Sequence, residues 1–332
     1  MILDLEDIKS ITTGAEYIEY TGECYKFFRF TKEEQNASYD YLMDYPAGVK
    51  MEFFTDAKKL KLKVKISDTA KVRTYFSFDI FENGKPIGTI QNLPEEQRVG
   101  NYAHKEYKTG SFCGEFDLSE KRSQVEIVFP YSVIAEIESM ELCGATYIEK
   151  VEKEKKYLSL GDSITQGYDA LHTSATYAYR IAKMLCAEHK NKAIAGAVFN
   201  PRLIAAADEN YKPDYISIAY GTNDWSWLDK KKFRENAEEY LKILLNKYPN
   251  AKIAVISPIW RADYQAVTPF GAFSEVSDVL FSICKKYPSI QFIEGIDLVA
   301  HSGEYFGDLA LHPSDEGFSM YFEGLADKIF KK

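Results

Sequence analysis

The hydrophobic periodicity of the sequence changes near residue 150, and this change constrains the fold more than any other feature. In residues 58–66, KKLKLKVKI, a lysine alternates with an apolar residue. A period of two is typical of a strand with one wet face and one buried face. Asn83-Gly84 separates two apolar runs and predicts a two-residue hairpin turn. No helical periodicity stands out before about residue 150, so residues 1–150 are predicted to form an antiparallel, jelly-roll-like β-sandwich.

Apolar strands alternate with helical stretches in the second half. The charged segment EKVEKEKK, residues 149–156, is interpreted as the connection between two domains. The predicted strands are YLSL, AIAGA, YISIAY, KIAVISP and QFIEGI, and helices are expected near residues 177–188, 231–247 and 273–286 and at the C-terminal end. Strands buried on both faces, each followed by a helix, predict a doubly wound parallel α/β sheet in residues 151–332. Ligands bind such a sheet at the carboxyl ends of its strands.

Composition argues against several classes of protein. The formal net charge is −9, which disfavours a nucleic-acid partner. The 5 cysteines contain no CxxC pair and the 5 histidines no HExxH spacing, so neither a disulfide framework nor a metal site is expected. The first ten residues do not resemble a secretory signal, and no run approaches the roughly 18 apolar residues of a membrane span. We therefore expect a cytoplasmic protein with no membrane partner. The oligomeric state is not predicted.

Three polar clusters lie at predicted strand ends or at the start of the last helix. Gly161-Asp162-Ser163 follows YLSL, the segment GTND at residues 221–224 follows YISIAY, and HPSD at residues 312–315 precedes the last helix. Gly196 lies in AIAGA, at the end of another predicted strand. The predicted fold therefore brings serine, glycine, asparagine and histidine together at one edge of the sheet.

In this order the clusters resemble the SGNH (GDSL-type) hydrolases over residues 156–330. The resemblance implies that Ser163 attacks an ester carbonyl and that His312 is the general base. It also implies an oxyanion hole made by the backbone N–H groups of Ser163 and Gly196 and the side chain of Asn223. The chemistry agrees, because a serine hydroxyl is a weak nucleophile without a base, and a developing oxyanion needs preorganised donors.

One feature of the resembled family is missing at its usual position. The family usually places an aspartate three residues before the histidine, but residue 309 is leucine. Asp308 lies one residue further back, and a local bulge would bring it to His312 as the orienting carboxylate. The alternative is a Ser–His dyad oriented by a backbone carbonyl. Both alternatives stay open at this point.

The substrate is predicted from the residues around these clusters. Trp225 and Trp260 follow predicted strand ends, and Arg261 adjoins Trp260, so the three are candidate substrate contacts. The pairing of the two predicted domains resembles two-domain carbohydrate acetyl esterases. We therefore expect hydrolysis of a short, acetyl-like ester on a small molecule or oligosaccharide, without a cofactor. The alternatives are an esterase or thioesterase for another short acyl compound, and a non-catalytic glycan-binding protein.

Overall fold

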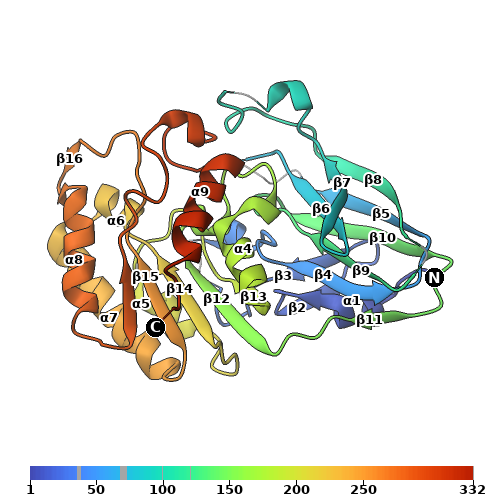
Figure 1. The fold of residues 1–332 in the computed structure, drawn as a ribbon, viewed down its shortest axis with the longest axis horizontal. Helices are drawn as coiled ribbons and strands as arrows, with labels where there is room; N and C mark the ends of the chain where they lie inside the picture. The colour runs from blue at the N-terminus through green and yellow to red at the C-terminus, as the bar shows by residue number, and fades with distance from the viewer. Residues whose placement is uncertain (36–38, 68–72, 99, 120, 332) are drawn as a thin grey trace.

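The computed structural model describes residues 1–35, 39–67, 73–98, 100–119 and 121–331, and it divides into two parts that lie side by side (Figure 1). The β-rich part contains strands β1 to β11 and is drawn in blue to green. The α/β part begins at β12 and runs through yellow to red. No helix in the described ranges is both long enough and apolar enough to cross a bilayer.

The β-rich part consists of two antiparallel sheets. Sheet A has the strand order β2-β3-β10-β5-β8, and sheet B has the order β1-β4-β9-β6-β7 with β11 paired to β4. The strands are β1 (Thr12–Thr13), β2 (Tyr17–Tyr20), β3 (Tyr25–Phe28), β4 (Lys50–Thr55), β5 (Lys59–Ile66), β6 (Ser77–Glu82), β7 (Lys85–Gln91), β8 (Gly110–Asp117), β9 (Ser123–Val128), β10 (Ala135–Cys143) and β11 (Ile148–Lys150). Apolar side chains of both sheets form one buried core. The predicted sandwich is therefore confirmed, while its jelly-roll connectivity stays a prediction.

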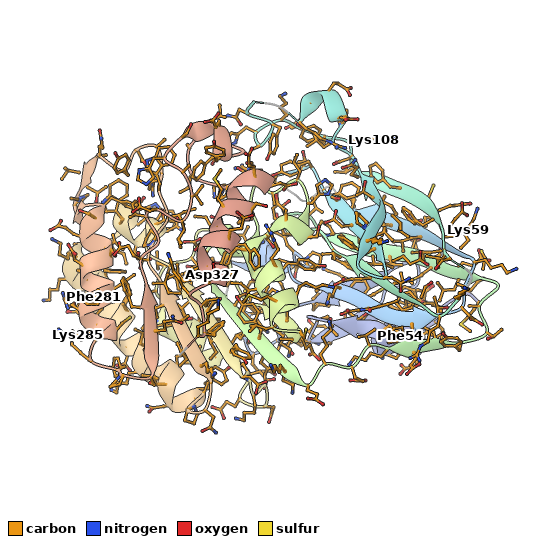
Figure 2. The ribbon with its side chains drawn as sticks, viewed as in Figure 1. Phe54, Lys59, Lys108, Phe281, Lys285 and Asp327 are labelled. Carbon is orange, nitrogen blue, oxygen red and sulfur yellow. The ribbon has the colours of Figure 1, made fainter. Side chains whose placement is uncertain are left out.

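The alternating pattern of β5 behaves as predicted. Leu60, Leu62 and Val64 are buried in the core, whereas the intervening lysines reach the surface, as Lys59 does at the outer end of the part (Figure 2). The hairpin between β6 and β7 turns at Asn83-Gly84, where both residues have positive φ. Only backbone conformations of this kind match the twist of the two strands in so short a turn.

Two short helices in the β-rich part were not predicted. They are α1 (Leu5–Ile11) and α2 (Asp40–Met43), and a 3₁₀ turn, η1 (Glu95–Gln97), lies in the same part. In α1, Asp4 caps the first turn and Ile8 and Ile11 are buried. Seven residues supply too few turns for a helical period to stand out in the sequence.

The α/β part is built on a parallel sheet with the strand order β13-β12-β14-β15-β18. Its strands are β12 (Lys155–Gly161), β13 (Ala187–Asn191), β14 (Tyr215–Ala219), β15 (Lys252–Ile256) and β18 (Ile290–Ile293), with a separate hairpin of β16 (Val267–Thr268) and β17 (Gly271–Ala272). The helices are α3 (Ser163–Gln166), α4 (Tyr177–Met184), α5 (Pro201–Ala206), α6 (Thr222–Trp227), α7 (Lys230–Lys247), α8 (Ser274–Cys284) and α9 (Asp315–Ala326), with 3₁₀ turns η2 (Thr173–Ala175) and η3 (Gly303–Tyr305). This is the predicted doubly wound sheet. From β12 the chain continues to β13 on one side and then to β14 on the other side of β12. The turn after β12 is therefore a topological switch point.

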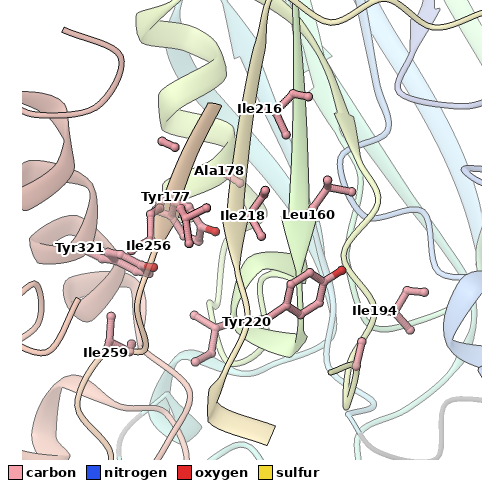
Figure 3. Close-up of a cluster of buried hydrophobic side chains, with 14 of the residues drawn as sticks. Leu160, Tyr177, Ala178, Ile194, Ile216, Ile218, Tyr220, Ile256, Ile259 and Tyr321 are labelled. Atoms are coloured by element: carbon pink, nitrogen blue, oxygen red, sulfur yellow. The ribbon is translucent and has the colours of Figure 1, made fainter. Parts of the chain in front are cut away.

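Side chains from the sheet and from the helices that cover it form the core of the α/β part. Leu160, Ile218 and Ile256 of the central strands belong to one buried cluster with Tyr177 of α4 and Tyr321 of α9 (Figure 3). The predicted boundary between the two domains, at residues 150 and 151, lies in the connection between β11 and β12 and stays a prediction.

One predicted strand is placed differently. AIAGA, residues 193–197, is the loop after β13 and not a strand, and the predicted helix at 177–188 ends at Met184 to make room for β13. Lys192 and Ile194 still donate backbone hydrogen bonds to β12. On the other side, the buried guanidinium of Arg29 binds the carbonyls of Asn191 and Ala193. Hydrogen bonds from a side chain of the β-rich part thus take the place of those that a further strand would make at this edge of the sheet.

Candidate active site

Ser163 lies on a sharp turn between β12 and α3. Asp162 caps the helix by accepting a hydrogen bond from the backbone N–H of Ile164 at 3.0 Å. Gly161 leaves no room for a side chain, since a Cβ there would lie 2.7 Å from the carbonyl oxygen of Ala219. The tight turn places Ser163 at the first position of α3, with its side chain at the carboxyl edge of the sheet. Strand-turn-helix geometry of this kind presents a serine hydroxyl for nucleophilic attack.

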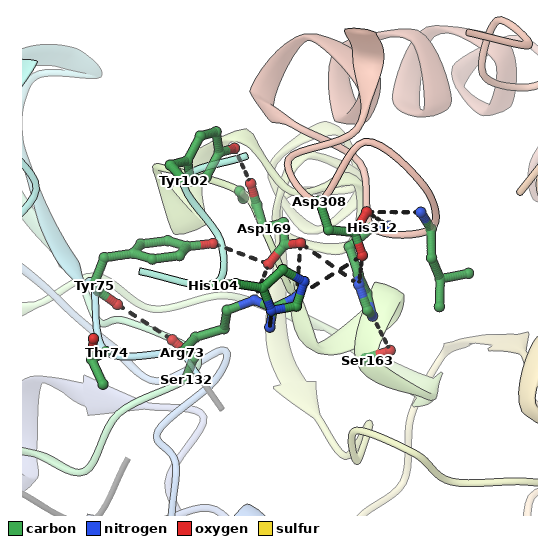
Figure 4. Close-up of polar contacts among 12 residues, drawn as sticks. Arg73, Thr74, Tyr75, Tyr102, His104, Ser132, Ser163, Asp169, Asp308 and His312 are labelled. Carbon is green, nitrogen blue, oxygen red and sulfur yellow. Dashed lines mark hydrogen bonds and ion pairs between the residues drawn. The ribbon is translucent and has the colours of Figure 1, made fainter. Parts of the chain in front are cut away.

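His312 lies between Ser163 and a carboxylate. Its Nε2 is 2.8 Å from the Ser163 hydroxyl, and its Nδ1 is 2.7 Å from Oδ2 of Asp308 (Figure 4). The histidine side chain comes from the loop before α9, and its ring centroid lies 5.6 Å from that of Tyr168. The Nδ1–H donates to the carboxylate in this arrangement, which leaves the Nε2 lone pair for the serine proton.

The spacing of four residues between Asp308 and His312 is accommodated by a compact loop. Leu309 adopts a left-handed backbone conformation with φ +62°. Oδ1 of Asp308 accepts hydrogen bonds from the backbone N–H groups of Ala310, Leu311 and His312. Oδ2 is then directed at the imidazole. The geometry is that of the bulge considered from the sequence.

The charge state of Asp308 follows from these contacts. Burial by itself raises the pKa of the Asp308 carboxyl, but the hydrogen bond and charge of His312 and the N–H groups of Leu311 and His312 outweigh it. The pKa of Asp308 is therefore held well below its ordinary value. In contrast, burial raises the pKa of Asp162 to about 7.

The candidate oxyanion donors come from the start of α3, the loop after β13 and the start of α6, at the same sheet edge. The side-chain Nδ2 of Asn223 donates to the carbonyl of Ala197 at 3.0 Å, which orients the amide and leaves its second N–H for another acceptor. In the part of the chain that the structure describes, the backbone N–H groups of Ser163 and Gly196 have no hydrogen-bond acceptor. Gln166 supports the loop by accepting the N–H of Ala195 at 2.8 Å.

Two of the three candidate substrate contacts are buried in the protein interior. Trp225 is only 1% exposed and its indole N–H donates to the carbonyl of Gly271, so its ring packs inside the protein in this structure, and its role as a substrate contact stays a prediction. Trp260 is buried beside His301 and Phe306. Arg261 binds the carbonyl and hydroxyl of Thr222 and pairs with Asp263. Its role as a substrate contact stays a prediction, and in this structure it holds the start of α6.

The exposed tryptophan of α6 is Trp227, not Trp225. Trp227 is 63% exposed, and its ring would lie 3.4 Å from a Cβ placed on Gly196. An exposed indole therefore lies beside a candidate oxyanion donor. The sequence places all of these tryptophans near strand ends, but only the helical geometry of α6 separates the inward-facing one from the outward-facing one.

Two site residues carry no recognisable sequence signal. Asp169, in the loop after α3, is fully buried, and its Oδ2 lies 3.6 Å from Nδ1 of His312. Arg73, from the β-rich part, binds both oxygens of this carboxylate, with its Nη2 3.0 Å from Oδ2 (Figure 4). The two residues are 96 positions apart in the sequence, so only the folded chain reveals the pair.

The ligand atoms of Asp169, Asp308 and His312 lie within 4.8 Å of one another, a spacing that would suit a metal ion. The guanidinium of Arg73, however, already binds both oxygens of Asp169, and a cation there would face this positive charge. Asp308 and His312 are also bonded to each other. These contacts favour proton transfer over metal binding, and the expectation of no metal stays a prediction.

The structure also has a groove away from these residues. A groove of about 670 Å³ separates the β6–β7 hairpin from α4 and α9, and Phe81, Arg180 and Phe322 are among its lining residues. Neither Ser163 nor His312 lines it. The hydrogen-bonded geometry, and not cavity size, locates the candidate active site.

A serine hydroxyl bonded to histidine at the carboxyl edge of a parallel sheet is characteristic of α/β hydrolases. Residues 159–319 match the model of the GDSL-like Lipase/Acylhydrolase family. This match agrees with the sequence resemblance over those residues and supports carboxylic ester hydrolase activity.

Solved structures share the whole two-part fold. A putative GDSL-like lipase from Bacteroides ovatus is similar with a TM-score of 0.73 at 15% identity, covering 96% of this chain and 94% of that one. A salicylyl-acyltransferase from a tetracycline biosynthetic pathway gives 0.72 at 15% identity, covering 94% and 92%. An acetyl xylan esterase from the rumen bacterium Butyrivibrio proteoclasticus gives 0.63 at 13% identity, covering 98% and 96%. These likenesses establish the fold class. No curated protein sequence matches the chain.

Proposed function

We propose that the protein hydrolyses short acyl esters, most specifically acetyl esters of carbohydrates, through Ser163, His312 and Asp308. The observation that carries this proposal is the hydrogen-bonded chain from the serine hydroxyl through both imidazole nitrogens to the carboxylate. In the first step Nε2 of His312 takes the hydroxyl proton while the serine oxygen bonds to the acyl carbon. The ester oxygen then leaves as an alcohol, carrying the proton that His312 returns.

The second half of the reaction reverses these roles. Water gives a proton to His312 and its oxygen bonds to the acyl carbon, after which the Ser163 oxygen leaves and regains its proton. The carboxylic acid is released. In both tetrahedral intermediates the negative oxygen is held by the N–H groups of Ser163 and Gly196 and the free N–H of Asn223. The charged imidazole is stabilised by Asp308 throughout.

Two observations support a short acyl group on a sugar. Ser163 is only 5% exposed and Asn223 only 8%, which leaves little room for a long acyl chain at the nucleophile. The exposed indole of Trp227 beside Gly196 offers an apolar face of the kind on which sugar rings pack. A structural neighbour of the same two-part fold is an acetyl xylan esterase, which agrees with this substrate class.

The alternatives make different predictions. A short-chain esterase or thioesterase of another class would use the same site but would not depend on Trp227. A non-catalytic glycan-binding protein was suggested by the leucine at position 309. The contact between Asp308 and His312 weighs against it, because it supplies the carboxylate that this spacing otherwise lacks.

The test compares hydrolysis of p-nitrophenyl acetate and butyrate by the wild-type protein, Ser163→Ala and Ser274→Ala. Ser274 is an exposed serine at the start of α8 and serves as the matched control. We expect acetate to be preferred, Ser163→Ala to fall to background, and Ser274→Ala to match wild type. Acetylated xylooligosaccharides and an acetyl thioester then separate the substrate classes. Equal rates for wild type and Ser163→Ala would refute the mechanism, and sugar binding without turnover would favour the non-catalytic alternative.

A further inference from the structure

We propose that Arg73, supplied by the β-rich part, is a positioning residue for the catalytic histidine. By neutralising Asp169, it leaves Asp308 as the carboxylate that holds the imidazole proton. This inference rests on the proposed function, because it concerns the same histidine. It assigns a role in the reaction to a part of the chain outside the matched family domain.

The starting observation is that two carboxylates, not one, face Nδ1 of His312. Asp308 lies at 2.7 Å and Asp169 at 3.6 Å. An imidazole Nδ1–H makes one good hydrogen bond, so the second carboxylate contributes mainly charge. Asp169 is fully buried, where an uncompensated negative charge acts strongly on its neighbours. Without compensation, Asp169 would favour the protonated imidazole before substrate binds.

Arg73 supplies that compensation. Its side chain is 4% exposed and bonds both Asp169 oxygens, while its Nη2 stays 3.9 Å from Oδ2 of Asp308. Although burial lowers the pKa of the Arg73 guanidinium, its hydrogen bond and charge interaction with Asp169 outweigh this and raise that pKa. The arginine is therefore cationic at every pH at which the enzyme would work.

Tyrosines of the β-rich part complete the pocket around Asp169. The hydroxyl of Tyr75 donates to Oδ1 at 3.2 Å, and the hydroxyl of Tyr102 donates to the backbone carbonyl of Asp169 at 2.5 Å (Figure 4). Oδ1 thus accepts from Arg73 and Tyr75 and Oδ2 accepts from Arg73, and these bonds fix the carboxylate in place. It cannot swing toward His312 to compete with Asp308 unless these bonds are broken.

The other groups near the histidine are few. Asp162 interacts with it from the turn before α3, Ser163 lies at Nε2, and the ring of Tyr168 packs beside it. His104 contacts Arg73, with its Nδ1 3.4 Å from Nη1. The charges closest to Nδ1 are therefore those of Asp308, Asp169 and Arg73, which makes a pH profile a specific readout.

The experiment measures kcat/KM for p-nitrophenyl acetate against pH in Arg73→Met, Asp169→Asn and the double variant. Arg73→Met leaves Asp169 uncompensated, so the imidazole keeps its proton longer and the acid limb should move up by about one to two pH units. Asp169→Asn leaves the positive charge of Arg73 uncompensated, so the acid limb should move to lower pH. The double variant removes both charges and should return the limb to within about 0.3 units of wild type.

Control variants separate this role from general damage. Arg122→Met removes an exposed arginine of the β-rich part that pairs with Glu149, and it should leave the profile unchanged. Arg73→Lys keeps the charge and should keep the limb in place while kcat falls. Circular dichroism and thermal unfolding show which variants fold. If Arg73→Met does not fold, the inference is tested by the shift of the acid limb to lower pH in Asp169→Asn and by its return toward the wild-type position in the double variant.

Unmoved limbs in folded Arg73→Met and Asp169→Asn, or shifts of both in the same direction, would overturn the inference and leave Arg73 a purely structural residue. This failure differs from failure of the proposed function. In the first case Ser163→Ala is still inactive and wild type still turns over ester. In the second, Ser163→Ala retains activity.

Discussion

The substitution Asp308→Asn tests the orienting carboxylate while keeping the loop that carries it. In the variant, the side-chain oxygen still accepts the N–H groups of Ala310, Leu311 and His312. An amide nitrogen takes the place of Oδ2, 2.7 Å from Nδ1 of His312. Because that nitrogen donates, it favours the imidazole tautomer with its proton on Nε2, which cannot accept the proton of Ser163.

The expected loss follows from this change of tautomer. In serine hydrolases the same aspartate-to-asparagine change lowers kcat by about 10⁴-fold, and we expect about 10³- to 10⁴-fold in kcat/KM here, about 4 to 5.5 kcal/mol of transition-state stabilisation. Asp308→Ala should cost less, since it places no donor beside Nδ1 to fix the wrong imidazole tautomer. Its loop loses three backbone contacts, so its stability should fall more.

The assay is steady-state hydrolysis of p-nitrophenyl acetate by wild type, Asp308→Asn, Asp308→Ala and His312→Ala, with urea unfolding of each protein. We expect Asp308→Asn to approach the activity of His312→Ala and to unfold close to the wild-type midpoint. If Asp308→Asn retained more than a tenth of wild-type kcat/KM, the Ser–His dyad would be the correct mechanism.

Three further predictions concern the oxyanion hole and the buried charges. Asn223→Ala should lower kcat about 10²- to 10³-fold with little change in KM, measured by initial rates; a loss confined to KM would remove Asn223 from the oxyanion hole. Burial raises the pKa of Asp224 to about 7. The free energy of unfolding of the wild type should therefore fall as pH rises from 5 toward 7. In urea titrations, the free energy of unfolding of Asp224→Asn should rise by about 2 to 3 kcal/mol relative to wild type between pH 5 and 8. If Asp224→Asn showed no such rise, the pKa of the Asp224 carboxyl would be close to its ordinary value. Arg29→Met should lower the free energy of unfolding by about 3 to 5 kcal/mol, because it leaves buried carbonyls without a hydrogen-bond donor. The control Arg202→Met, at an exposed position, should change it by less than about 0.5 kcal/mol. Equal effects would contradict the buried contacts of Arg29.

The residues whose positions were predicted from the sequence are those governed by local rules. Ser163, Asn223 and His312 follow strands or precede a helix, and the carboxyl ends of parallel strands meet at one edge. The position of Asp308 depended on one backbone angle, the positive φ of Leu309, which a leucine rarely adopts and which no pattern announces. The geometry of the pair is therefore visible only in the structure.

Helix geometry explains why the two tryptophans of α6 differ in exposure. Trp225 and Trp227 both lie on α6, and residues two apart on a helix point to nearly opposite sides. One ring is consequently buried and the other exposed. Arg73 and Asp169 could not be paired from the sequence at all, because their contact depends on how the two parts of the chain pack.

The same packing has a consequence for how the chain is made. The carbonyl of Asn191 that Arg29 binds is synthesised 162 residues after the arginine itself. At about 5 to 20 residues per second, the nascent β-rich part waits roughly 8 to 30 s with this cation unmatched. During translation the early half is therefore an incomplete folding unit, and a ribosome stalled near residue 160 should carry a protease-sensitive chain.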